Sequence, residues 1–202
     1  MFSGIVSALG EIIDARMEGD LHLDIACDYA PQSLVPGASI SCSGICLTVI
    51  EAAERGGQGS SFSVQASAET RERTTLGRWA KGTRINLERA MKLGDEIGGH
   101  IVSGHVDAIC TITDITPEGD SKRFRFRMPP KLAPLIAEKG SVCLDGTSLT
   151  VSAVEDDAFD VNIIPYTLKV TTWGKMRPGD SVNIEIDMLA RYVARLQEFQ
   201  SR

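Results

Sequence analysis

The chain has 202 residues, which is enough for one large domain or for two domains of about 100 residues each. Its content of 43% hydrophobic and 24% charged residues is ordinary for a soluble globular protein. The net charge is −6 and Lys and Arg form no block, which argues against nucleic acid as the main partner. No apolar run approaches the roughly 18 residues that cross a bilayer, so we expect no membrane segment.

The cysteines and histidines suggest neither disulfides nor a metal site. There are 5 cysteines, an odd number without a C-x-x-C motif, which suits free thiols in a reducing cytoplasm. Cys42 and Cys46 lack a second pair nearby, and the histidines of 100–105 do not form the H-E-x-x-H pattern. The N-terminal segment 1–15 lacks a basic region, so we expect no signal peptide and a cytoplasmic protein.

Strand patterns dominate the first half of the chain. Alternating apolar residues predict strands at 20–27, 38–42, 45–49, 61–67 and 83–89. Gly44 lies between two of them, where a bulge or bend would reset the alternation. The residues of 54–61 predict a turn, and 30–37 allows only a short helical turn.

The second half repeats this order. Segment 101–115 corresponds to 1–15 and shares its S-G-x-V core. Segment 122–128 alternates aromatic and apolar residues with arginines, which predicts a half-buried strand whose arginines face solvent. Segment 129–140 begins with prolines and ends with a glycine, and 182–187 is the last predicted strand.

Two pairs of matching segments indicate that a whole domain is duplicated. Residues 37–49 match 139–151 without a gap, and residues 74–88 match 171–185 in the same order. Several short strands with Gly and Pro turns in each copy predict a small antiparallel barrel or sandwich. We therefore expect an all-β protein with one domain at 1–97 and a second at 98–186.

The periodicity changes after the second copy. Apolar residues recur at helical spacing between 187 and 202, which predicts a helix that has no equivalent in the first copy. Asp187 suits the N-cap position. The stripe would pack either against the helix's own barrel or against other copies of the chain. The residues of the stripe are Leu189, Tyr192, Val193, Leu196 and Phe199.

The chain resembles the riboflavin synthase α-chain family from residue 1 to about 190. The resemblance rests on MFSGIV, GICLTV, LGDEIGGHIVSGHVD, DGTSLTV and VNIEID, which occur in the family's order. It implies two six-stranded Greek-key barrels and a C-terminal helix through which three chains form a trimer.

The resemblance also implies an activity, the last step of riboflavin biosynthesis. Two molecules of 6,7-dimethyl-8-ribityllumazine exchange a four-carbon unit to give riboflavin and 5-amino-6-(ribitylamino)uracil, without metal or organic cofactor. The site would lie between the first barrel of one chain and the second barrel of a neighbour. Two related pockets that hold two identical heterocycles in different roles would explain the duplication.

The resemblance assigns residues of both barrels to the ligand. In the first barrel they are Gly4, Ile5, Val6, Cys46, Leu47, Thr48, Gln65, Ala66, Ser67, Ala68, Glu69 and Thr70. In the second barrel they are Gly104, His105, Val106, Lys139, Ser148, Leu149, Thr150, Asn162, Ile163, Ile164, Pro165, Tyr166 and Thr167, with Asp187 close to the site. Tyr166 departs from the P-E-T sequence that family members often have there.

The differences between the copies suggest separate catalytic roles. Cys46 in the first copy corresponds to Ser148 in the second, and Ile5 corresponds to His105. We hypothesise that Ser148, Thr150 and His105 serve the second barrel's lumazine. They would help to deprotonate its C7 methyl or deliver a nucleophile to C7. Cys46 and Thr48 would serve the other lumazine.

Simpler interpretations remain beside these roles. Cys46 could be an inert core thiol, His100 a brace for a glycine-rich turn, Lys139 a surface lysine and Asp187 only a helix cap. A non-catalytic lumazine or flavin antenna protein of the same fold is the alternative function. A flavin reductase domain would need a G-x-G-x-x-G motif after a strand, and the sequence has none.

Overall fold

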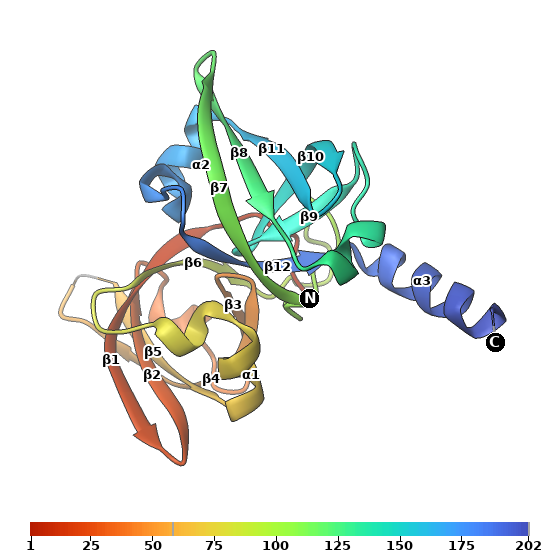
Figure 1. Cartoon of the computed structure of the whole chain (residues 1–202). Helices are drawn as coiled ribbons and strands as arrows, with labels where there is room; N and C mark the ends of the chain where they lie inside the picture. Colours follow the sequence, from red (N-terminus) through yellow and green to blue (C-terminus); the bar gives the residue numbers. More distant parts are fainter. Residues whose placement is uncertain (58, 202) are drawn as a thin grey trace.

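In a computed structural model, which describes residues 1–57 and 59–201, the chain forms two closed antiparallel barrels and a terminal helix (Figure 1). This confirms the predicted fold class. The strands of the first barrel are β1 (Ala8–Glu18), β2 (Asp20–Cys27), β3 (Ser39–Cys42), β4 (Ile45–Glu54), β5 (Ser60–Ala66) and β6 (Arg84–Arg89). They are hydrogen-bonded in the order β1-β2-β5-β4-β3-β6.

The second barrel repeats this arrangement. Its strands are β7 (Ala108–Glu118), β8 (Ser121–Arg127), β9 (Ser141–Leu144), β10 (Thr147–Glu155), β11 (Ala158–Ile163) and β12 (Ser181–Ile186). Read from β7, the closed order is the one found in the first barrel. The boundary predicted at 97/98 falls in the connecting segment between β6 and β7, outside both barrels.

Short helical segments join the strands. The α-helices are α1 (Ala68–Arg73) and α2 (Pro165–Val170), and the 3₁₀ turns are η1 (Pro31–Ser33), η2 (Thr75–Arg78), η3 (Pro130–Leu135) and η4 (Thr172–Lys175). Gly44 is not at a bulge, because Ser43 and Gly44 form the two-residue turn between β3 and β4 with φ of 44° and 80°. The register shift of β4 lies instead between Val49 and Glu51. The predicted turn at 54–61 includes Gln58, which lies outside the described residues.

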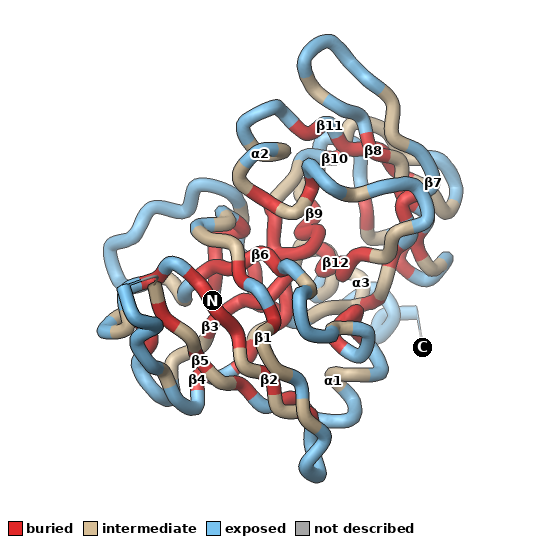
Figure 2. Tube along the Cα trace, turned by 90° about the vertical axis from the view of Figure 1, so that its left-hand side faces the viewer, coloured by how far each residue is buried: buried red, intermediate tan, exposed pale blue. Residues whose placement is uncertain are grey.

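Each barrel encloses its own apolar core. The first core is aliphatic, with Leu23, Ile25 and Val64 fully buried. The second has an aromatic centre, where the Trp173 ring packs nearly perpendicular to the rings of Phe124 and Phe126. The arginines of β8 alternate with these phenylalanines on the outer face, as predicted. Figure 2 shows the buried residues gathered along the strands, while the loops are exposed.

The two barrels meet around an approximate two-fold axis. Phe2 and Val102 exchange both backbone hydrogen bonds, at 2.8 and 3.0 Å. Asn86 of β6 donates to the Asp145 carbonyl and accepts from the Thr172 amide, both at 2.9 Å. Asn183 of β12 makes the reciprocal contacts in the other direction. These buried amide groups are fully paired across the interface, which fixes one barrel relative to the other.

The terminal helix α3 (Met188–Gln200) extends away from both barrels (Figure 1). Asp187 caps it by accepting a hydrogen bond of 2.9 Å from the Leu189 amide. All five apolar stripe residues are exposed, from 54% for Val193 to 72% for Phe199. The stripe therefore does not pack on its own barrel. Arg202, the last residue of the predicted segment 187–202, lies outside the described residues, and no described helix is long and apolar enough to span a membrane.

Candidate active site

Matching strands of the two barrels present the predicted ligand residues on their outer faces. On β4, Leu47 and Val49 are buried in the core, so Thr48 between them points outward and is exposed. Thr150 of β10 is the exposed counterpart of Thr48. Each threonine pairs with a serine of the neighbouring strand, Ser39 or Ser141. The chain therefore carries two similar polar surfaces, one on each barrel.

The N-terminal loop covers the surface of the second barrel. The Gly4 carbonyl accepts a hydrogen bond of 2.8 Å from the Ser148 amide. Gly4 has a φ of 76°, and a Cβ there would lie 2.5 Å from the Ser148 Cβ, so only glycine allows this approach. Gly4 therefore contacts the second barrel, although the sequence analysis placed it with Ile5 and Val6 at the first barrel's site, because the Phe2–Val102 bridge carries the loop across.

The reciprocal loop covers the surface of the first barrel. The Gly104 carbonyl accepts a hydrogen bond of 2.9 Å from the Cys46 amide, and a Cβ at Gly104 would lie 2.5 Å from the Cys46 Cβ. Val106, two residues further on, packs against the first core. His105 follows Gly104 in this loop, so the structure brings its backbone near Cys46, whereas the sequence analysis grouped it with Ser148.

His100 is the histidine that contacts Ser148. Its Nδ1 lies 2.7 Å from the Ser148 Oγ. Its Nε2 is buried, with no hydrogen-bond partner among the described residues. Burial lowers the pKa of His100, and the charge of Asp187 opposes this only in part. The ring is therefore neutral near pH 7, and a neutral imidazole on a serine hydroxyl can accept its proton.

The sequence analysis favoured a bracing role for His100, because the residue follows the glycine pair Gly98 and Gly99. Asp187 caps α3 and also acts on the charge of His100, so its two predicted roles are compatible.

Two buried glutamates hold the loops, and the sequence analysis gave them no role at the site. Glu88 of β6 accepts hydrogen bonds from the amides of Ser3 and Gly4 and from the Ser3 hydroxyl, at 2.7 to 3.0 Å. Glu185 of β12 accepts from the amides of three consecutive residues, 103 to 105, at 2.7 to 2.8 Å. The signal was present, because Glu88 and Glu185 match each other in the duplicated segments.

The comparisons with known proteins agree with this duplicated architecture. The family model described as lumazine binding domain matches residues 3–90 and again 103–187. The chain is 51% identical over 202 residues to the riboflavin synthase of Brucella abortus, covering 99% of this chain and 100% of the relative. It is 41% identical over 200 residues to that of Mycobacterium tuberculosis, covering 97% and 98%.

The chain belongs to the riboflavin synthase family. It is therefore an enzyme. Its fold is also that of a solved protein, LumP, complexed with 6,7-dimethyl-8-(1'-D-ribityl) lumazine, with a TM-score of 0.78 and 22% identity over 92% of this chain and 99% of that chain. LumP complexed with riboflavin superposes with a TM-score of 0.79 and 24% identity over the same shares. At this identity the likeness to LumP concerns the fold alone.

Lys139 adopts a backbone conformation that is uncommon for a lysine. Its φ is 64°, where Gly37 in the first barrel has a φ of 86°. Both residues donate their amide to the matching valine carbonyl, that of Val151 or Val49, at 2.9 and 2.8 Å. A non-glycine residue in this region stores strain, which is often found at functional positions. Lys139 therefore holds a strained backbone conformation that Gly37 adopts without strain in the first barrel.

The last residues of β5 and β11, with the residues that follow them, border the same outer faces. The register pairs Val49 with Val64 and Val151 with Val161, which brings these segments alongside Thr48 and Thr150. The Gln65 amide contacts the His22 ring at 2.9 Å. The other residues of the two segments are the buried Ala66 and Ile163, the exposed Ser67, Ala68, Glu69, Asn162, Ile164, Pro165 and Tyr166, and the half-buried Thr70 and Thr167.

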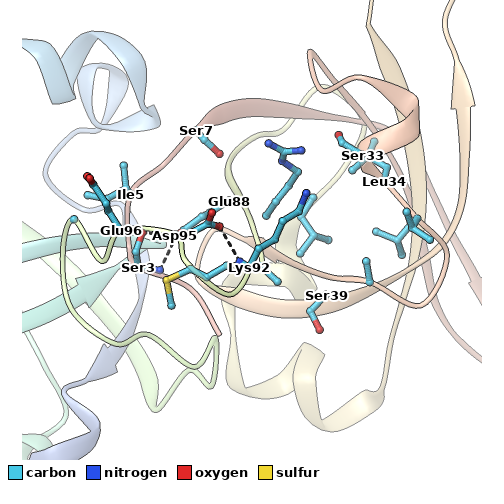
Figure 3. Close-up of a pocket in the computed structure, with 18 of the residues that line it drawn as sticks. Ser3, Ile5, Ser7, Ser33, Leu34, Ser39, Glu88, Lys92, Asp95 and Glu96 are labelled. Carbon is cyan, nitrogen blue, oxygen red and sulfur yellow. Dashed lines mark hydrogen bonds between the residues drawn. The ribbon is translucent and has the colours of Figure 1, made fainter.

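A cavity of about 910 Å³ lies beside the first barrel, between the N-terminal loop, η1 and the connecting segment (Figure 3). Its lining includes Ile5, Ser39, Glu88 and Lys92 but neither Cys46 nor Ser148. Of the predicted ligand residues, only Ile5 is among the residues that line this cavity. No cluster of His, Cys, Asp or Glu that could hold a metal ion is found within 1–57 and 59–201.

Proposed function

We propose that the chain converts two molecules of 6,7-dimethyl-8-ribityllumazine into riboflavin and 5-amino-6-(ribitylamino)uracil. The observation that carries the proposal is the pair of matching but unequal sites, one with Cys46 and His105 and the other with Ser148 and His100. A reaction between two identical molecules requires one to give and one to receive the four-carbon unit. Two related surfaces with different polar groups supply those two roles.

The reacting molecules meet between two chains. Within one chain Gly4 and Gly104 leave the Phe2–Val102 bridge in opposite directions. Two residues on each side, at about 3.3 Å per residue, separate the two loops by about 13 Å. The fully buried Phe2 and Val102 stand between them. Reacting atoms need to approach to about 3–3.5 Å, so the second site is supplied by a neighbour.

The exposed stripe of α3 provides a means of association. Five large apolar side chains on one helical face, each more than half exposed, favour contact with equivalent helices. A trimer in which each first barrel faces a neighbour's second barrel closes as a ring and leaves no site unpaired. The free thiols suit a reducing cytoplasm.

At the second barrel, His100 and Ser148 act as a proton-transfer pair. The neutral imidazole accepts a proton through the serine hydroxyl, either from the C7 methyl of the bound lumazine or from a nucleophile that adds at C7. Thr150 lies on the same outer face and hydrogen-bonds the ligand. At the first barrel, Cys46, Thr48 and His105 bind the other lumazine.

The proposal is tested by incubating the purified protein with 6,7-dimethyl-8-ribityllumazine and no added metal or cofactor. We expect one riboflavin for two lumazines consumed, with the aminouracil as co-product. Tight binding of lumazine or riboflavin without turnover would favour the non-catalytic antenna function instead.

A further inference from the structure

Glu88 and Glu185 are buried carboxyl groups that lack a cationic partner among the described residues. Their residues are 6% and 2% exposed, and neither forms a salt bridge with a described Lys or Arg. The donors are instead consecutive backbone amides, aided at Glu88 by the Ser3 hydroxyl. Such an amide cradle binds an anion by geometry, so each carboxylate fixes the position of the loop that supplies the amides.

Each loop is in turn pressed against a reactive side chain of a site. The Glu88 loop contacts Ser148 through Gly4, and the Glu185 loop contacts Cys46 through Gly104. Glu88 belongs to the first barrel and Ser148 to the second, and the reverse holds for the other pair. The structure therefore links each glutamate to the site of the opposite barrel.

We propose that Glu88 is a positioning residue for the Ser148 site and Glu185 is one for the Cys46 site. The role rests on the proposed function, because it assumes that lumazine binds at these two surfaces. Each glutamate acts through its glycine loop and does not touch the ligand. As a result of the duplication, each barrel positions the loop that borders the site of the other barrel.

Replacing either glutamate by glutamine keeps the shape and removes one acceptor. Both oxygens of Glu88 and both of Glu185 accept from N–H or O–H groups. A glutamine has one oxygen, so its NH₂ group must face at least one donor. The loop then moves away from the strand, and a displacement near 1 Å at a reacting centre can lower turnover by up to about 100-fold.

The cysteines allow the two loops to be followed separately. Cys46 is half-buried beneath the Gly104 loop, while the other four cysteines are buried. Its rate of labelling by a thiol reagent reports on that loop. In a second background, Cys46→Ser with Ser148→Cys, the introduced thiol reports on the Gly4 loop. Glu11→Gln, an exposed carboxylate of β1, is the matched control.

We expect Glu185→Gln to accelerate labelling of Cys46 about tenfold and to leave the thiol introduced at 148 within about twofold. Glu88→Gln should do the reverse, and each variant should lower lumazine turnover at least about tenfold while Glu11→Gln changes neither. Equal acceleration at both thiols would indicate general loosening and overturn the proposal. Unchanged labelling, or unchanged turnover in both variants, would overturn it as well.

A milder pair of variants covers the case in which a glutamine variant does not fold. The Ser3 hydroxyl donates to Glu88 at 2.7 Å, whereas among the described contacts Ser103 gives Glu185 only its amide. Ser3→Ala should therefore accelerate labelling at 148 by a few-fold, and Ser103→Ala should not alter labelling of Cys46. Equal effects would contradict the assignment. If the native chain made no riboflavin, the proposed function would fail, while the labelling pattern would still decide whether the glutamates hold the loops.

Discussion

Asp145 gives the fold a stability that depends on pH. It stands in the turn between β9 and β10 with a φ of 43°, where Ser43 occupies the matching position with a φ of 44°. Its carboxylate accepts one hydrogen bond, 2.8 Å from the Asn183 amide, just as the Ser43 hydroxyl accepts from the Asn86 amide at 3.1 Å. Burial raises the pKa of Asp145 from 3.8 to about 7.

The direction in which stability changes with pH follows from this raised pKa. The folded state prefers the protonated carboxyl, so the group's stabilising effect is complete below pH 3.8 and is lost as the pH rises through about 7. Each pKa unit corresponds to about 1.4 kcal/mol, which makes the ionised carboxylate cost about 4 kcal/mol above pH 7. About 3 kcal/mol of this cost develops between pH 5 and pH 8.

Asp145→Ser places the residue of the first barrel in the second and removes the ionisable group. We expect the difference in melting temperature, variant minus native chain, to increase by about 6–12 °C as the pH rises from 5 to 8 for a chain of this size. Thermal unfolding followed by circular dichroism at several pH values measures the difference, and Asp120→Ser, at an exposed turn, is the control. A difference that stayed constant from pH 5 to 8 would refute the reasoning.

Three further changes probe the site and the interfaces. His100→Ala and Ser148→Ala should each lower turnover at least about tenfold, and the double variant should be no worse than the poorer single one, because the two share one hydrogen bond. Steady-state kinetics would contradict this if the two effects multiplied. Asn183→Ala leaves the Ser43 carbonyl and the Thr75 amide unpaired, and urea unfolding should show a loss of about 2–4 kcal/mol. A loss below about 1 kcal/mol would mean that water replaces the amide. Truncation after Ile186 removes α3 and should give a monomer in analytical ultracentrifugation, whereas a surviving trimer would exclude association driven by the helix.

The periodicity of the sequence was sufficient to predict many of the strands and the terminal helix, but not the short helices α1 and α2. Strands such as β8 bury alternate residues, here Phe124 and Phe126, so local patterns record which face meets the core, whereas β6 and β12 bury consecutive residues. The stripe of α3 was visible for the same reason. The repeated segments then predicted two copies of one barrel, because matching sequences fold to matching topologies.

The site was harder to predict because its contacts cross from one copy to the other. Gly4 lies near the first barrel in sequence but touches Ser148, 144 positions away, and no local pattern encodes that crossing. His100 and Ser148 likewise meet through tertiary structure, with 48 positions between them. Glu88 and Glu185 read as ordinary strand residues, since their loop amides are distant in sequence.

The central claim is that each active site combines the first barrel of one chain with the second barrel of another. Thr48→Arg and Thr150→Arg change matching exposed positions of β4 and β10, one in each barrel. Each variant alone should be inactive, because every site then contains one blocked half. Co-expressed with different tags and isolated as mixed oligomers, the two should recover about a third of native turnover, because one of the three sites in a mixed trimer combines two intact halves. No recovery in mixed oligomers would show that both lumazines bind within one chain and would contradict the account.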